Sequence, residues 1–255
     1  MMRHKACEIA LIGLVLSGCA TTRAPAGWQG DFSADAVITR AIAAQGSGGV
    51  ETTRASGSSI KGTFRVQRRI DGVLVEETQR LYMIAPETWA MHISGAGDDH
   101  VYLCSGGQCS ELRNDVVVRS GVAIGETGVD RLLRGLFLLR WLRHDTDARA
   151  RVDGTMAGED GGDWIRIAKP DADGQECVAI LDAATLRPCG LTQSALIDGR
   201  RFSLDTRYGS FANDDLGNAY PTEIVSTGSD GFEEIVRVVE LRRRDGMDPR
   251  RFRLP

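Results

Sequence analysis

The stretch "GVDRLLRGLFLLRWLRH", Gly128 to His144, is the segment whose burial decides the fold of this chain. Its leucine and arginine content favours a helix. At about 100° per residue, its apolar side chains surround the helix axis, whereas an ordinary surface helix shows one apolar stripe. These side chains are Leu132, Leu133, Leu136, Phe137, Leu138, Leu139, Trp141 and Leu142. The segment therefore needs apolar contact on several sides.

Three interpretations of this helix are open at the level of the sequence. It is a core helix that crosses a sheet, or it lies in the mouth of a curved sheet and seals an apolar cavity that a lipid chain could enter. The third is a helix lying on a membrane, since arginines at both ends would suit lipid headgroups. The first two interpretations are compatible with each other.

The chain on both sides of this helix has the pattern of short antiparallel strands. Phe64 and Val66 alternate with Arg65, and a turn signal follows at Asp71 and Gly72. Further strands are expected at 73–84, 88–94, 100–104, 164–168, 177–181, 190–197, 201–208, 222–227 and 232–242. Turn signals separate them, which predicts a meander of antiparallel strands.

Four cysteines fall into two local pairs. Cys104 and Cys109 flank the Gly-Gly centre of "CSGGQC", which suits a tight hairpin turn and places the two cysteines side by side. Opposed residues in such a pair lie about 4.5–5.5 Å apart at Cα, within disulfide range. Half of a zinc site and a redox dithiol are the alternatives, although each prefers another spacing or further ligands. The same argument favours a disulfide between Cys177 and Cys189.

The N-terminus has the layout of a signal peptide over residues 1–18, with basic residues, a short apolar run and small residues at its end. The run is far shorter than the ~20 residues of a membrane-spanning helix. The stretch Leu16-Ser17-Gly18-Cys19 resembles the lipobox of bacterial lipoproteins. In these proteins, cleavage before the cysteine leaves it to carry fatty acyl chains such as palmitate.

Several acyl chains on Cys19 would hold the protein on a membrane almost permanently. Lipoproteins with Asp after the modified cysteine tend to stay in the inner membrane, and this chain has Ala20 there, which favours the outer membrane and its periplasmic side. Residues 19–32 are rich in Ala, Thr, Pro and Gly, so we expect a flexible tether. One domain is expected over residues 33–255.

The composition describes an ordinary globular domain. It has 42% hydrophobic and 26% charged residues and a net charge of −4, which indicates no nucleic-acid partner.

Motifs near both ends of the domain carry a family resemblance. Ser33 is a suitable N-cap for a helix from 34 to about 45, and "SSIKGTF" (Ser58–Phe64) then opens the first strand. The last third contains "AYPTEI" (Ala219–Ile224) and closes with "DGMDPRRFRLP" (Asp245–Pro255). This order of elements resembles the outer-membrane lipoprotein-sorting superfamily, the LolA- and LolB-like half-barrels.

The resemblance implies a mainly β fold, a curved antiparallel sheet of about ten or eleven strands that forms an incomplete barrel with helices over its concave face. It also implies an apolar cavity that receives an acyl chain of a lipid or lipoprotein, in lipoprotein or lipid trafficking. The side chains expected to line this cavity are Phe64, Trp89, Met91, Leu132, Leu136, Phe137, Leu139 and Trp141.

No pattern points to catalysis. Ser58 and Lys61 have a Ser-x-x-Lys spacing, but they precede a strand and lack the partner motifs. His92 and His100 flank a polar hairpin tip, which explains them without a metal. We therefore expect no enzyme, no cofactor and no metal. The alternative function is a non-enzymatic interaction or structural lipoprotein of the envelope without a ligand cavity.

Overall fold

The computed structural model describes residues 23–45, 58–85, 88–95, 99–105, 108–122, 129–144, 150–158, 161–170, 175–197, 200–215, 217–228 and 231–245. The expected signal peptide, the lipidation site Cys19 and the "DGMDPRRFRLP" ending after its first residue lie outside these ranges.

Most of the described chain is strand. The strands are β1 (Ser58–Ile70), β2 (Val73–Ala85), β3 (Thr88–Ser94), β4 (His100–Ser105), β5 (Gln108–Arg113), β6 (Val116–Val122), β7 (Arg151–Ala157), β8 (Asp163–Pro170), β9 (Glu176–Asp182), β10 (Pro188–Ile197), β11 (Arg200–Tyr208), β12 (Phe211–Asn213), β13 (Ala219–Pro221), β14 (Glu223–Gly228) and β15 (Glu233–Asp245). All pairings between them are antiparallel in the described part of the chain.

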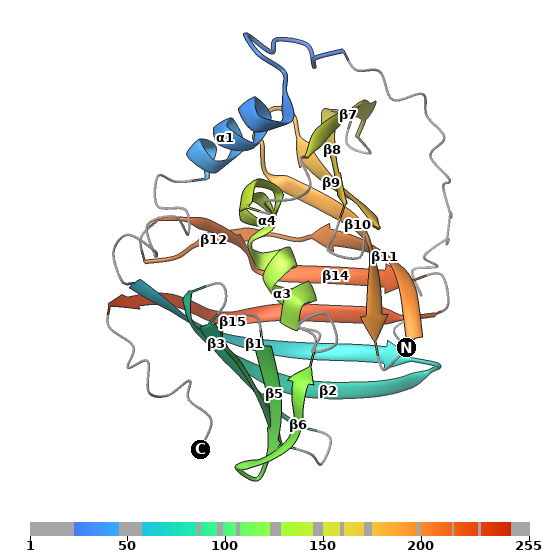
Figure 1. The fold of residues 1–255 in the computed structure, drawn as a ribbon. Helices are drawn as coiled ribbons and strands as arrows, with labels where there is room; N and C mark the ends of the chain where they lie inside the picture. The colour runs from blue at the N-terminus through green and yellow to red at the C-terminus, as the bar shows by residue number, and fades with distance from the viewer. Residues whose placement is uncertain are drawn as a thin grey trace, which may run out of the picture.

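Thirteen of these strands form one curved sheet in the order β6-β5-β4-β3-β2-β1-β15-β14-β11-β10-β9-β8-β7, and β12 pairs with β13 separately (Figure 1). The strands β6 and β7 stand at opposite edges and do not pair with each other. The sheet is thus an incomplete barrel, as predicted, with more strands than the ten or eleven expected.

The edge strands β6 and β7 were not expected from the sequence, and they account for part of the difference between the observed and the expected number of strands. Val116, Val117 and Val118 of β6 are consecutive and all exposed, so this strand lacks the alternation that reveals a half-buried strand. It forms because β5 offers a pairing edge. In the middle of the sheet, β1 pairs with β15 from Ser58 opposite Asp245 to Arg69 opposite Glu233, which joins the two halves of the chain.

The expected helix at 128–144 is divided in two. Its parts are α3 (Val129–Leu136) and α4 (Leu138–His144). Phe137 lies between them, yet its N–H donates to Leu133 O at 2.9 Å, and Trp141 N–H donates to Phe137 O at 3.0 Å. The helical hydrogen-bonding pattern therefore crosses the junction. No described helix is long and apolar enough to cross a membrane.

The helices cover one face of the sheet and complete two core clusters (Figure 1). Leu132 and Leu136 of α3 pack into the first cluster, with residues of β1–β5, β14 and β15. Leu138, Leu139 and Leu142 of α4 belong to the second, with residues of β8–β10. The segment is therefore a buried core helix whose apolar residues face in several directions, as its pattern predicted.

The helix α1 (Ala34–Ala44) covers the β7–β10 end of the sheet (Figure 1). As expected, Ser33 is its N-cap, and its hydroxyl accepts from Ala36 N–H at 3.3 Å. The preceding residues 23–32, expected as part of a flexible tether, also make contacts. Thr155 Oγ1 donates to Arg23 O at 3.3 Å, and Arg40 lies 4.6 Å from the centre of the Trp28 ring.

The first predicted disulfide is confirmed, because Cys104 and Cys109 are directly opposed on β4 and β5 and are bonded. The second prediction is wrong, since Cys177 and Cys189 form no disulfide. The register of β9 and β10 is the reason. It places Pro188 opposite Leu181 and Thr192 opposite Val178, so the two cysteines lie toward opposite ends of this pairing.

Candidate functional site

The residues expected to line a ligand cavity are divided between two core clusters. Six belong to the first core cluster or pack against it, namely Phe64, Trp89, Met91, Leu132, Leu136 and Phe137. Leu139 belongs to the second cluster, and Trp141 packs against it. The division follows from the helix geometry, because apolar side chains around one axis cannot all point the same way. The eight side chains therefore belong to two parts of the core, and the lining of a cavity by them stays a prediction.

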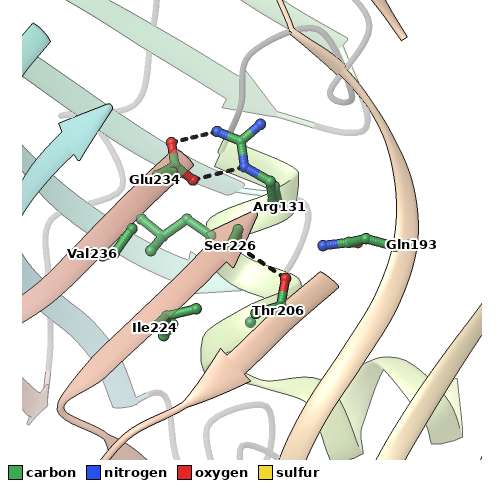
Figure 2. A pocket seen from close by; sticks show the side chains of 9 residues that line it. Arg131, Gln193, Thr206, Ile224, Ser226, Glu234 and Val236 are labelled. Atoms are coloured by element: carbon green, nitrogen blue, oxygen red, sulfur yellow. Dashed lines mark hydrogen bonds and ion pairs between the residues drawn. The ribbon is translucent and has the colours of Figure 1, made fainter. Parts of the chain in front are cut away.

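The space between α3 and the sheet is small, and both polar and apolar side chains line it. It measures about 10 Å³, enough for roughly one water molecule. Its polar lining comes from α3 and from four neighbouring strands and consists of Arg131, Gln193, Thr206, Ser226 and Glu234 (Figure 2). Leu132, Gly135, Ile224 and Val236 complete it. Between these described side chains the free volume is far smaller than an acyl chain requires.

A line of four buried or half-buried polar side chains crosses the sheet beneath α3, and we call it the polar row. Thr206 is opposite Ser226, Ser226 is opposite Glu234, and Glu234 is opposite Arg68. Directly opposed residues point to the same side of a sheet, so the four side chains share the face that α3 covers. Thr206 and Ser226 share a hydrogen bond of 2.9 Å, and Arg68 Nε donates to Glu234 Oε2 at 2.8 Å.

Arg131 joins α3 to this row. Its Nε donates to Glu234 Oε1 at 2.9 Å and its Nη2 donates to Glu234 Oε2 at 2.7 Å, as Figure 2 shows. Such a two-pronged pair is directional and charge-assisted. Burial by itself would raise the pKa of Glu234, but Arg131 and Arg68 together lower it to about 2. Glu234 is therefore a buried carboxylate that carries its charge and is shared by two cations.

A second set of polar contacts holds the junction of α3 and α4. Arg134 Nη1 donates to Gln193 Oε1 at 3.0 Å, and the guanidinium lies 5.0 Å from the centre of the Trp141 ring. Lys169, fully buried, donates from Nζ to Trp141 O at 2.8 Å and to Leu142 O at 3.2 Å. A cation on the last carbonyls of a helix stabilises its end. Both short helices are thus held by charged groups as well as by apolar packing.

Tyr208 lies near this junction and contacts both core clusters. Burial raises the pKa of its phenol, although Arg134 acts in the opposite direction. The hydroxyl is buried and has no hydrogen-bond partner among the described residues. It is a polar group inside the region where α3 and α4 meet the sheet.

The arrangement provides charged and polar groups for binding. Among the described residues there is no group of three potential metal ligands. Glu234 is held charged by two arginines, so it is a poor proton donor or acceptor near neutral pH. The site thus places a buried ion pair next to apolar surface.

In the sequence, the residues of the polar row stand out only as polar residues at inward strand positions that are otherwise apolar. Thr206 occupies an inward position of a strand whose other inward residues are Phe202, Leu204 and Tyr208, and Glu234 precedes the alternating Val236. Polar residues at inward positions are a signal of a buried polar contact. Their partners cannot be found from that signal, because the strands that meet are far apart in the chain.

A wider groove of about 390 Å³ lies outside the helices, on the surface formed by residues 25–29, Arg40, Ala183 and Ala184. It is lined by the N-terminal segment and the turn after β9, and it is separate from the polar row.

No family model matches the sequence, and no curated protein matches it. Solved structures do match the fold. A LolA superfamily protein from Nitrosomonas europaea has a TM-score of 0.60 and 13% identity over 88% of this chain and 98% of its own. A DUF1329 family protein from Desulfovibrio piger has a TM-score of 0.54 and 12% identity over 86% and 96%.

A candidate outer membrane lipoprotein-sorting domain from Vibrio parahaemolyticus has a TM-score of 0.50 and 15% identity, and the match covers 84% of this chain and 94% of that one. At such identities the likeness concerns the fold. The chain therefore has a LolA-like fold, as its resemblance to the lipoprotein-sorting half-barrels predicted.

Proposed function

We propose that this protein is a non-enzymatic lipoprotein of the bacterial envelope that binds an acyl chain of a lipid or lipoprotein between the sheet and the α3–α4 segment. The LolA-like fold supports the proposal, since one of its structural neighbours carries a lipoprotein-sorting name. The lipobox at Cys19 supports the location.

The observation that carries the proposal is that two very short helices cover the apolar face of the sheet. The helix α3 has 8 residues and α4 has 7. Even with the hydrogen bonds that join them across Phe137, they span only residues 129–144, close to the ~12–15 residues below which isolated helices are marginal in water, so they depend on packing against the sheet. An acyl chain offers the sheet the same apolar contact, and it can therefore take the place of α3 without unfolding the strands.

The size of the available free energy is adequate for a carrier. Burying about ten methylene groups of an acyl chain contributes about 8 kcal/mol before the losses of association and of moving α3. No catalytic group is needed for this binding. In this proposal the ligand chain takes the place of α3 on the sheet.

A cross-link between α3 and β14 tests whether α3 must move. A Cβ at Gly135 would lie 3.2 Å from Ile224 Cδ1 and 3.7 Å from Ile224 Cγ2, so cysteines at these two positions are close enough to pair. We expect the oxidised Gly135→Cys, Ile224→Cys variant to lose uptake of a fluorescent probe with an uncharged head and an acyl chain, and the reduced variant to regain it. Each single variant, taken through the same oxidation and reduction, is the control. Equal uptake in the locked and reduced forms contradicts the proposal.

The membrane anchor is tested separately. The Cys19→Ser variant should move from the membrane fraction to the soluble fraction and lose incorporated palmitate, because the lipid site is the only anchor proposed. Retention of the variant in the outer membrane would contradict the anchor without affecting the ligand proposal.

Side chains largely fill the space between the sheet and α3, and this close packing favours a second candidate function. The candidate is an interaction module that uses the sheet as a rigid platform without a ligand. The cavity of about 10 Å³ beneath α3 is the observation in its favour. Native mass spectrometry of the purified protein separates the two candidates. Bound lipid supports the carrier. The platform is supported if no lipid is bound, the fluorescent acyl probe is not taken up, and a partner still binds after Leu136 and Phe137 are made polar.

A further inference from the structure

We propose that the ligand carries an ammonium head on its apolar chain, and that this head replaces Arg131 on the carboxylate of Glu234. The inference rests on the proposed function, because it requires α3 to leave the sheet. It adds the chemical class of the ligand, a cationic amphiphile such as an amine-headed lipid.

If α3 leaves the sheet, Arg131 leaves with it. Arg131 belongs to the helix, whereas Arg68, Thr206, Ser226 and Glu234 belong to the sheet. When α3 moves away, Glu234 loses two donors, those now at 2.9 Å and 2.7 Å. It keeps Arg68 Nε at 2.8 Å. The sheet is then left with one carboxylate that has lost half of its charge partners.

The carboxylate of Glu234 determines the charge of the group that can replace Arg131. The side chain of Glu234 is 6% exposed while α3 covers it, and a ligand chain in the place of α3 would keep it buried, so water supplies little compensation in the ligand-bound state. A buried carboxylate that loses a cation is strongly unfavourable unless another cation or donor replaces it. A carboxylate or phosphate head would be repelled at the same point. The position therefore selects for a positively charged donor.

The space beside Glu234 is the right size for a small head group. The space beside Glu234 measures about 10 Å³ and borders the hydroxyls of Thr206 and Ser226, as Figure 2 shows. An ammonium has three donors and is of the size of a water molecule, so it can serve Glu234 and a neighbouring hydroxyl together. Ile224 and Val236 line the same space and belong to the first core cluster. A chain attached to the ammonium would thus continue over apolar surface.

Arg131 is, in this view, the internal occupant of a cation site. Its guanidinium satisfies Glu234 while no ligand is present, and its release is compensated when the ammonium arrives. The exchange keeps the number of charges on the sheet constant, which a neutral or anionic ligand cannot do.

The test compares probes with one chain and different heads. Dodecylamine, dodecanol and dodecanoate, each below its micelle concentration, are titrated into the full-length protein by calorimetry, with ethanolamine as the head alone. We expect dodecylamine to bind at least about tenfold more tightly than dodecanol, dodecanoate to bind most weakly, and ethanolamine to show no measurable binding. Equal binding of the amine and the alcohol, or tighter binding of dodecanoate, overturns the inference and leaves the carrier proposal standing.

Two variants assign the effect to the site. Glu234→Gln should bring the ratio between amine and alcohol close to one. Arg131→Gln, which removes the internal competitor and keeps Glu234 with Arg68, should tighten dodecylamine binding. An unchanged ratio in Glu234→Gln, or weaker amine binding in a folded Arg131→Gln, contradicts the inference. Failure of all three chain probes to bind contradicts the proposed function itself. Binding of ethanolamine as tight as that of dodecylamine contradicts the inference that the ligand needs an apolar chain.

Discussion

Replacement of Glu234 by glutamine should destabilise the protein strongly, although the two side chains have the same shape. In the wild-type protein Glu234 is shared by Arg131 of α3 and Arg68 of β1, and it is 4% exposed as a whole residue. Glutamine leaves these two buried cations without the negative charge between them. Removing one partner of a buried ion pair is more costly than never having had the pair.

The magnitude follows from the pKa of the carboxyl group. Its ordinary value is 4.5, and the two arginines lower it to about 2 against the opposing effect of burial. Each pKa unit corresponds to about 1.4 kcal/mol, so the charge of Glu234 contributes about 3 kcal/mol to the free energy of unfolding. This value lies within the range for breaking a buried ion pair.

The same reasoning fixes the pH dependence. A depressed pKa in the folded state means that the contribution is fully present above the unfolded value near 4.5 and is lost as the pH falls toward about 2. The wild type should therefore lose about 3 kcal/mol more than Glu234→Gln across this window. At pH 2 the two proteins should be close in stability.

Urea unfolding between pH 7 and pH 2, followed by circular dichroism, measures this difference. Glu233→Gln is the matched control, because Glu233 is the neighbouring residue, points to the other face and pairs with Arg69 at 3.9 Å with both side chains largely in solvent. Its loss should stay below about 1 kcal/mol. A loss of less than about 1 kcal/mol for Glu234→Gln, or the same pH dependence with and without the carboxylate, would refute the reasoning.

Three further predictions concern the helices and the disulfide. Gly135→Val should lower the stability by about 1–3 kcal/mol in thermal unfolding. A Cβ at this position would already lie 3.2 Å from an Ile224 methyl group, so a branched side chain forces α3 outward. A variant as stable as the wild type would contradict this packing. Lys169→Met should cost about 2 kcal/mol in urea unfolding, since the last carbonyls of α4 lose a buried donor, and Lys169→Arg should recover part of the loss. The double variant Cys104→Ser, Cys109→Ser should lose about 2 kcal/mol relative to the oxidised wild type, and reduction of the wild type should reproduce that loss.

Local patterns in the sequence were sufficient for the elements and for the disulfide of one hairpin. Alternation with period two shows which residues of a strand point inward, and Cys104 and Cys109 lie at the two ends of a short turn that alone makes them opposed. Cys177 and Cys189 are separated by a longer turn with a bulge, so their register was open and the predicted disulfide is absent. Edge strands such as β6 lack alternation and were missed.

By itself, the sequence determined that the chain is mainly β, that one helical segment must be buried on several sides, and that its motifs resemble the lipoprotein-sorting half-barrels. Only the tertiary structure decided that this segment is divided at Phe137, with helical hydrogen bonds across the junction, and that its apolar residues belong to two clusters. It also decided that Arg68, Thr206, Ser226 and Glu234 form one row beneath Arg131. The physical reason is that side-chain period is a local property, whereas strand neighbours and register are set by pairing between segments far apart in the chain.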